Sequence, residues 1–313
     1  MVSRPSTPVL VLVALVLFLV WSNSFIAIGY LLGADEAAPR TDWIGLTVLR
    51  FIPAGLICGA YCLYRRREAW DILRKHPLRV LFCGVLTVPG YNLALYYGQQ
   101  HGVPAPIAAL TTALVPLFVM LMAAVFLAER LTLRRVAGFL ISVTGMGLIA
   151  SAKSGDVEAY PLLIAVTAGA PLCWSVFSVI SKPLAGRIPM LVWTYLCTAV
   201  GTLLALPLIP LTGNEPLRQA AALDATGWGA LLFLAVPCTV LGFAIWTWLL
   251  RFLPASTVGF TVFLNPPLTT SSKYLFSLLL PTVFVFDIRP LEWLGGAVTL
   301  AGLAVAVWVR GSR

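Results

Sequence analysis

Charged residues are scarce in this sequence. Of its 313 residues, 11% are charged and 60% are hydrophobic, and the mean hydropathy is +0.94. A soluble globular protein needs far more charge to cover its surface, so this composition excludes that class. Long polar segments are lacking as well, and we therefore expect no soluble domain on either side of a membrane.

Residues that carry out catalysis or bind metals are also few. The two histidines, His76 and His101, fall in opposite loops, and no nucleophile elbow, zinc-protease motif or phosphate-binding loop occurs. No pair of carboxylates lies within an apolar segment. The six cysteines all do, and we interpret them as small packing residues and not as disulfide partners. We expect neither an enzyme nor a metal site nor a cofactor.

Ten apolar segments are each long enough to cross a bilayer as a helix. The first is too long for a cleaved secretory signal and is followed by acids instead of a small-residue cleavage site, so we expect a retained helix. The ten predicted spans are residues 9–32, 43–64, 77–97, 104–127, 133–151, 161–181, 189–211, 227–252, 254–280 and 291–309.

The basic residues lie mainly in alternate loops. When the loops are assigned alternately to two sides, with the N-terminus in the cytoplasm, 15 basic residues lie inside and four outside, whereas three acids lie inside and nine outside. This bias is what the positive-inside rule predicts for ten spans with both termini in the cytoplasm. We expect the membrane to be a bacterial inner membrane. The net charge of +9 then reflects topology and attraction to membrane lipid, and a nucleic-acid partner is not expected.

The second half of the sequence repeats the first, which divides the chain into repeats of residues 1–153 and 154–313. Each repeat has five spans, an odd number, so the second copy enters the membrane in the opposite orientation. A two-fold axis in the membrane plane exchanges the two faces of the bilayer, which is an arrangement that carriers use. The equivalent positions are Pro104, Ala105, Thr111, Leu114 and Pro116 with Pro254, Ala255, Thr261, Leu264 and Pro266, Trp21-Ser22 with Trp174-Ser175, Pro89 with Pro237, and Gly138 and Gly145 with Gly295 and Gly302.

Short motifs in the first repeat are typical of one transporter family. They are Trp-Ser-Asn-Ser-Phe at 21–25, Leu49-Arg50-Phe51, Ala94-Leu95-Tyr96, the small residues Ala105, Ala108 and Ala109, Pro116, Glu129-Arg130-Leu131, and the glycines at 138 and 145. In order, spacing and duplication the sequence resembles the EamA family of the drug/metabolite transporter superfamily over essentially its full length. The resemblance implies an all-α integral membrane protein, with ten transmembrane helices in two inverted five-helix repeats. It also implies a central cavity and secondary transport, usually export, of small metabolites such as amino acids.

One part of the second repeat departs from the first. The spacing from Pro266 to Gly295 is 29 residues, against 22 from Pro116 to Gly138, and an apolar insertion turns near Pro281. The second repeat also lacks a counterpart of Glu129. We expect this carboxylate to cap a helix or to pair with a loop arginine, without a mirrored contact in the second repeat.

Two basic residues lie inside predicted spans, Arg50 and Lys273. Each costs roughly 2.5–3.5 kcal/mol at mid-bilayer. Lys273 ends a row of polar residues spaced by four that includes Asn265, and Pro266 and Pro267 leave backbone carbonyls one turn back without donors. Lys273 either binds a substrate carboxylate or neutralises a helix end. Arg50 either bonds to neighbouring helices or contacts substrate.

Other polar and aromatic residues inside the spans suit a cavity for zwitterions, or alternatively helix-to-helix hydrogen bonds. The candidates are Asn23, Tyr91, Asn92, Tyr96, Trp174, Ser178 and Trp246, together with Arg50, Asn265 and Lys273 as binding residues and Pro116, Pro266, Pro267 and Glu129 as hinge or structural residues.

The leading functional hypothesis is an exporter of a small polar metabolite, most readily an amino acid, that works by alternating access. A nucleotide-sugar or organophosphate exchanger would need several converging basic residues. A drug or lipid carrier would need a more apolar cavity with a buried acid. Because no carboxylate lies within a span core, both proton coupling and facilitated diffusion remain open, as do the substrate's identity and the oligomeric state.

Overall fold

Apolar helices determine the architecture. The computed structural model describes residues 5–33, 39–101, 111–112, 114–152, 161–279 and 289–307, and these are helical apart from short connections. Eight of the described helical segments are long and apolar enough to span a membrane. The prediction of an all-helical membrane protein is therefore confirmed.

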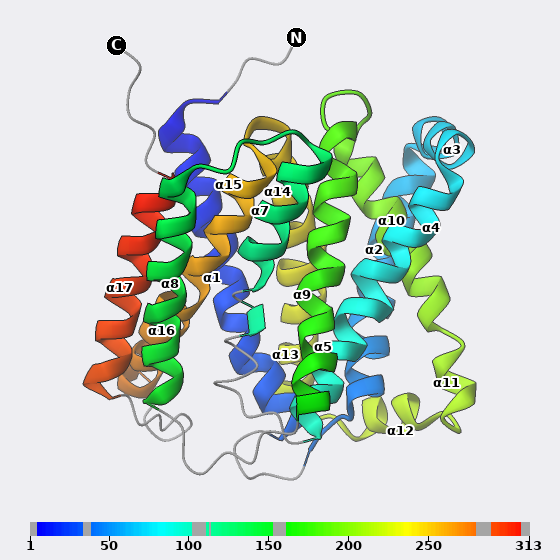
Figure 1. Cartoon of the computed structure of the whole chain (residues 1–313). Helices are drawn as coiled ribbons and strands as arrows, with labels where there is room; N and C mark the ends of the chain where they lie inside the picture. The colour runs from blue at the N-terminus through cyan, green and yellow to red at the C-terminus, as the bar shows by residue number, and fades with distance from the viewer. Residues whose placement is uncertain are drawn as a thin grey trace.

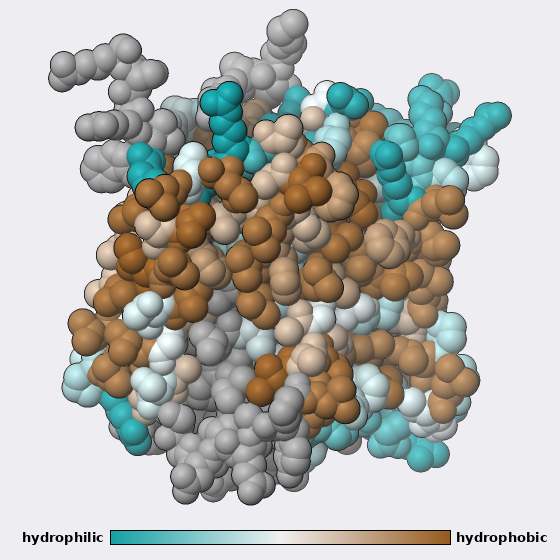
Figure 2. Space-filling model, viewed as in Figure 1, coloured by the Kyte–Doolittle hydropathy of each residue, from teal (hydrophilic) through white to brown (hydrophobic). Residues whose placement is uncertain are grey.

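The surface matches a membrane environment. Figure 2 shows hydrophobic side chains around the middle of the molecule and hydrophilic ones gathered at its two ends. Large apolar residues such as Leu56, Val125 and Leu133 are exposed, as lipid-facing residues are. The helices run between the two ends, and both the start of α1 and the end of α17 lie at the same end, at the top of Figure 1.

The first repeat contains five helical passes, of which the third is interrupted by a π-helical segment. The predicted fourth span, 104–127, is described only from residue 111, without residue 113. The elements are α1 (Thr7–Leu32), α2 (Trp43–Tyr64), α4 (Pro77–Val85), η1 (Leu86–Gly90), α5 (Tyr91–Gln100), α7 (Leu114–Phe126) and α8 (Leu133–Ser151).

The second repeat follows the same order. Its predicted ninth span, 254–280, is divided by a 3₁₀ turn directly before Asn265. Pro266 and Pro267 follow in the first turn of the next helix, where their missing N–H groups cost least. The elements are α9 (Pro161–Ser181), α10 (Met190–Ala205), α13 (Ala225–Phe233), η3 (Leu234–Leu241), α14 (Gly242–Phe252), α15 (Ala255–Phe260), η4 (Thr261–Leu264), α16 (Asn265–Leu279) and α17 (Pro290–Val307).

Three short helical elements, at 66–75, 182–184 and 215–222, lie outside the predicted spans, and a fourth, at 208–211, falls at the end of the predicted seventh span. The charged segment after α2 reads as a loop by hydropathy, yet it forms α3, which buries Ala69 and Ile72. Glu68 in its first turn and Arg74 and Lys75 in its last turn match the helix dipole. The short elements are α3 (Arg66–Lys75), η2 (Lys182–Leu184), α11 (Leu208–Leu211) and α12 (Glu215–Ala222).

The two repeats meet along α8 and α17, which lie side by side in Figure 1. A Cβ on Gly145 would lie 2.5 Å from Gly295 O, and one on Gly138 would lie 2.6 Å from Gly302 O. At the centre, Ser142 Oγ donates to Thr299 O over 3.1 Å, and Thr299 Oγ1 donates to Ser142 O over 3.4 Å.

This packing is antiparallel and reciprocal. Gly138 contacts the equivalent of Gly145, Gly145 contacts the equivalent of Gly138, and the equivalent residues Ser142 and Thr299 bond to each other. Such reciprocity is the property of a two-fold interface, and small residues allow the backbones to approach closely. The structure thus has the inverted arrangement that the odd number of spans predicts. The predicted boundary at 153/154 and the insertion at Pro281–Asp287 lie outside the described residues.

Candidate substrate-binding cavity

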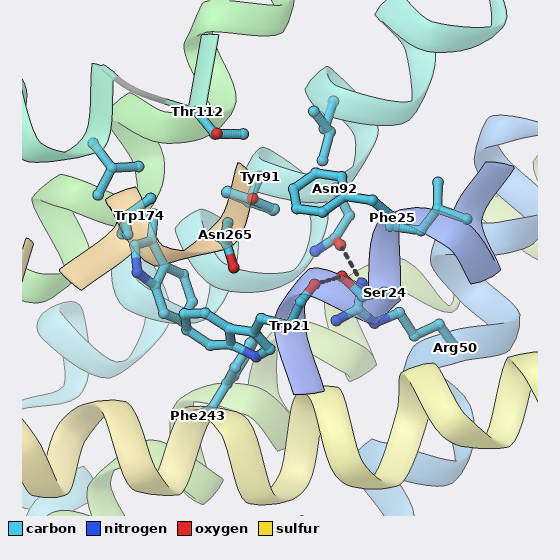
Figure 3. A pocket seen from close by; sticks show the side chains of 14 residues that line it. Trp21, Ser24, Phe25, Arg50, Tyr91, Asn92, Thr112, Trp174, Phe243 and Asn265 are labelled. Atoms are coloured by element: carbon cyan, nitrogen blue, oxygen red, sulfur yellow. Dashed lines mark hydrogen bonds between the residues drawn. The ribbon is translucent and has the colours of Figure 1, made fainter. Parts of the chain in front are cut away.

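A cavity of about 70 Å³ lies between the two repeats, near the middle of the helices. Helices α1, α2, α5, α7, α9, α14 and α16 and the turn η4 all contribute to its wall, part of which is shown in Figure 3. A space of this size holds a few water molecules. Its lining consists of Trp21, Ser24, Phe25, Ile28, Arg50, Tyr91, Asn92, Leu95, Thr112, Val115, Trp174, Phe243, Val262 and Asn265.

The cavity lies across the interface between the repeats. Trp21 and Trp174 hold equivalent positions, and their ring centroids are 5.5 Å apart. Equivalent residues from both repeats therefore face one space, as expected of a site on a pseudo-two-fold axis. Three further lining pairs follow the same offsets as the repeated prolines: Leu95 and Phe243, Thr112 and Val262, and Val115 and Asn265.

Pro89 organises one polar part of the wall. It lies in the π-helical segment η1, where the backbone ladder is disturbed. Asn92 Nδ2 donates to Thr87 O over 3.1 Å and to Val88 O over 2.9 Å, so the side chain satisfies carbonyls of this segment. The amide is thereby fixed, and its Oδ1 is directed at Arg50, 3.4 Å from Nη1.

Pro237 plays the same part in the second repeat. It lies in the π-helical segment η3, and Thr239 Oγ1 donates to Leu234 O, five residues back, over 2.8 Å. Because its proton is used there, the hydroxyl oxygen is left as an acceptor. It accepts from Arg50 Nε over 2.9 Å. Two equivalent proline-containing segments therefore position two acceptors for one arginine.

Arg50 is the one cation among the described residues that line the cavity, and 7% of its surface is exposed. Its third hydrogen bond runs from Nη1 to Tyr96 Oη over 2.6 Å. All three partners are neutral, and within the described part of the chain Arg50 has no carboxylate partner and Nη2 makes no hydrogen bond. A buried guanidinium of this kind favours an anion that can reach it, and a carboxylate fits its geometry.

Aromatic rings form the opposite part of the wall. Trp21 stacks on Trp246 with ring centroids 5.6 Å apart, and Trp174 lies 4.8 Å from Phe243. The indole of Trp21 is fixed by a 2.8 Å hydrogen bond from Nε1 to Cys238 O. Gly242 makes this approach possible, because a Cβ there would collide with the indole. This part of the wall is apolar, and the indole of Trp21 is held by ring packing and by this hydrogen bond.

Asn265 brings a further polar group to the cavity, at the first residue of α16. It is 7% exposed, and its Oδ1 has no hydrogen-bond partner among the described residues. An unsatisfied buried acceptor costs about 1–3 kcal/mol. Asn265 is equivalent to Val115, so only one of the two repeats places an amide here.

The predicted binding residues divide into three groups: residues that line the cavity, residues that support the lining from behind, and residues that lie outside it. Arg50, Tyr91, Asn92, Trp174 and Asn265 line the cavity. Residues behind the lining support it: Tyr96 bonds to Arg50, and Trp246 Nε1 donates to Ser178 Oγ over 3.0 Å.

Asn23 and Lys273 lie outside the lining. Asn23 Nδ2 donates to Leu19 O over 2.7 Å in its own helix, and Lys273 is two turns beyond Asn265 in α16.

Several lining residues were missed by sequence reasoning, above all Trp21, Phe25 and Phe243. One signal was present for Trp21, because it is repeated as Trp174, which was a candidate. Nothing in the hydropathy of the helices distinguishes Phe25 or Phe243 from residues that face lipid or core.

Glu129 closes the repeat interface at the end where α1 begins. Its carboxylate accepts from Ala255 N over 2.7 Å, from Ser256 N over 3.3 Å and from Ser256 Oγ. It also lies 3.7 Å from Arg135 Nη1. The side chain after α7 thus caps α15 of the other repeat, and both alternatives from the sequence, capping and pairing with an arginine, are seen together.

The repeated prolines of the fourth and ninth spans directly follow Val115 and Asn265, which line the cavity. Pro116 is buried in the first turn of α7, and Pro266 and Pro267 follow Asn265 in α16. A further cation, Lys182, lies near the end where α1 begins, and its Nζ donates to Leu250 O over 2.7 Å and to Leu253 O over 2.6 Å.

Comparison with known proteins gives one family and several relatives. The sequence matches the EamA-like transporter family over residues 8–151 and again over 161–308. It is 28% identical to a probable terminal-alkyne amino-acid exporter of Streptantibioticus cattleyicolor, over 93% of this chain and 91% of that protein. It is 31% identical to the aromatic amino acid exporter YddG of Ancylobacter novellus, over 51% of this chain and 56% of that protein. A crystal structure with 24% sequence identity superposes with a TM-score of 0.73, covering 96% of this chain and 97% of the other, which shows the fold.

Proposed function

The chain belongs to the EamA-like transporter family, and on this premise we propose that it exports an amino acid with an apolar side chain across a bacterial inner membrane. The observation that carries the proposal is the position of Arg50. A buried cation with neutral partners faces a cavity whose remaining wall is largely aromatic. One end of the site suits a carboxylate, and the other suits an apolar group.

The carboxylate of the substrate binds to Arg50. A charge-assisted hydrogen bond to a buried arginine is worth about 1.5–3 kcal/mol. Two acceptors and Tyr96 hold the guanidinium in place, so little side-chain entropy is lost when the substrate binds. An organophosphate or nucleotide sugar is less well matched, because Arg50 is the one cation among the described lining residues.

The apolar side chain of the substrate packs against Trp21, Trp174 and Phe243. Fixed aromatic rings provide a large contact area at low entropic cost. The names of the relatives support this assignment, since terminal-alkyne and aromatic amino acids both carry apolar side chains. Ser24 and Asn265 are then available to the substrate ammonium group.

Transport follows from the inverted repeat by alternating access. The contact between Glu129 and α15 closes the end of the interface where α1 begins, which we assign to the cytoplasm together with both termini. This contact has to open for substrate to enter from that side. Since the second repeat has no equivalent carboxylate, the opposite end closes by other means.

The direct test is efflux of a labelled amino acid such as leucine or phenylalanine from proteoliposomes. Arg50→Gln is expected to reduce transport about 10- to 100-fold, the equivalent of the lost charge-assisted bond. The control is Arg218→Gln, which removes a surface arginine 3.6 Å from Glu215 and is expected to leave transport unchanged. Equal transport by the Arg50→Gln and wild-type proteins, at equal amounts in the membrane, would remove Arg50 from the site.

A further inference from the structure

A second cavity lies between α1, α2, α10 and α14, close to the ends of α2 and α14. Its volume is about 420 Å³. It shares no residue with the central cavity. Val13 in this second cavity and Trp21 in the central one are eight residues apart on α1, which is about 12 Å of helix. Phe18, which lies between Val13 and Trp21 on α1, is buried in the core, as is Trp246, which stacks on Trp21.

Polarity along α14 changes in one direction within this second cavity. Ile245, Trp248 and Arg251 follow each other at intervals of three residues, so they lie on one side of the helix. They run from an apolar residue through an amphipathic ring to a cation at the helix end. Tyr61 and Arg65 repeat this order at the end of α2. Aromatic residues next to basic ones mark the level of lipid headgroups.

The charges in this cavity do not balance. Arg65 bonds to Glu68, and this hydrogen bond raises the pKa of Arg65, so it stays a cation. Arg251 has a ring contact with Phe252, 5.5 Å from the ring centroid, and no carboxylate partner among the described residues. Two guanidinium groups therefore face one carboxylate.

We propose that this cavity binds one anionic phospholipid of the leaflet on that side. The phosphate lies at Arg65 and Arg251, and an acyl chain lies along Val13, Ile245 and Trp248. The match is one of charge and depth: the cations are at the membrane surface, and the apolar wall continues toward the bilayer centre. Basic pockets between transmembrane helices bind anionic lipids by this chemistry. Glu68 opposes the phosphate and limits the affinity.

The test is native mass spectrometry of the whole protein released from nanodiscs of phosphatidylglycerol and phosphatidylcholine with matched acyl chains. The wild-type protein is expected to retain phosphatidylglycerol preferentially. Arg251→Gln is expected to reduce the retention of phosphatidylglycerol about fivefold, because this is the usual contribution of one arginine near an anionic membrane surface. Glu68→Gln is expected to increase retention, a gain that a misfolded protein would not give. Excess glycerol phosphate is expected not to compete, because it has no acyl chain.

The matched control is Arg66→Gln, which removes a cation next to Arg65 that does not line the cavity. It is expected to leave lipid retention nearly unchanged. Equal losses for Arg66→Gln and Arg251→Gln would show general surface attraction and overturn the proposal. Equal retention of the two lipids by the wild-type protein, or displacement by glycerol phosphate, would also overturn it. None of these outcomes bears on Arg50 or on transport, so the two proposals fail independently.

Discussion

Pro89 and Pro237 hold equivalent positions in the two repeats, and each lies in a π-helical segment beside the cavity. The polar groups that follow them differ. The first repeat places Asn92 there and supplies Arg50, whereas the second places Thr239 there and has no charged residue in α10, its own second span. At Asn265 the polar residue belongs to the second repeat instead, since the equivalent residue in the first repeat is the apolar Val115. Duplication has kept the backbone features and changed the side chains, so the cation among the described lining residues comes from one side only. The proposed substrate would accordingly bind in one orientation.

The interface between α8 and α17 shows the opposite behaviour, with reciprocal contacts preserved on both sides. Gly145→Val would break this symmetry most strongly, because the new side chain meets the backbone of Gly295 and Thr299 at about 2.5 Å. We expect a loss of unfolding free energy at the upper end of roughly 1–3 kcal/mol. Thermal unfolding in detergent measures it.

Two variants of the same kind sharpen this comparison. Gly302→Val, at the equivalent position, is expected to cost about as much as Gly145→Val, because a Cβ there would lie 2.5 Å from Ser142 N and 2.6 Å from Gly138 O. Gly147→Val is the control, since a Cβ at Gly147 meets no atom within 4 Å. A similar loss for Gly147→Val and Gly145→Val would show that the reciprocal packing is not the cause.

Glu129 makes a contact to the other repeat, and the sequence of the second repeat has no acid at the equivalent position. Glu129→Gln keeps the shape but weakens the cap on α15, at a cost of about 1 kcal/mol, or about fivefold in the open population. We expect faster labelling of a cysteine introduced at Val258, a buried residue of α15, in a background without native cysteines. The matched control is Glu215→Gln, an exposed partner of Arg218. Unchanged labelling in Glu129→Gln would mean that this contact does not hold the interface closed.

Asn92 and Thr239 allow the two halves of the arginine site to be compared directly. Asn92→Leu removes an acceptor for Arg50 and two side-chain hydrogen bonds, to Thr87 O and Val88 O, whereas Thr239→Val removes one acceptor and one hydrogen bond, to Leu234 O. At about 1 kcal/mol for each lost hydrogen bond, Asn92→Leu is expected to weaken both stability and substrate affinity more. Melting temperatures and ligand titrations give the order. The reverse order would place the main support of Arg50 in the second repeat.

Much of the fold could be predicted from the sequence, because hydropathy and the repeat depend on the chain alone. The charged segment Arg66–Lys75 was not recognised as a helix, since its hydropathy resembles that of a loop. Pro266 and Pro267 were predicted to disturb the backbone hydrogen bonds of the ninth span. Their effect on which side chains face the cavity was not predicted. A regular spacing of four placed Asn265 and Lys273 in one row, yet Asn265 lines the cavity and Lys273 does not.

The role of Arg50 depends on contacts that no local pattern contains. Two of its three acceptors come from residues 42 and 189 positions away. Both of these are oriented by π-helical segments that sequence periodicity does not reveal. The prolines at 89 and 237 were recognised as equivalent, but their effect on Asn92 and Thr239 required the folded chain. Sequence reasoning could therefore name Arg50 as a candidate without distinguishing support of the fold from substrate binding.

One measurement tests most directly the claim that Arg50 receives the carboxylate of an amino acid. The melting temperature of the purified protein is followed against leucine or phenylalanine and against the matched amides, which keep the side chain and ammonium group but lack the negative charge. A ligand that binds the folded state raises the melting temperature. We expect stabilisation by at least one of the amino acids and none by its amide, with the effect lost in Arg50→Gln. Equal stabilisation by an amino acid and its amide would contradict the account.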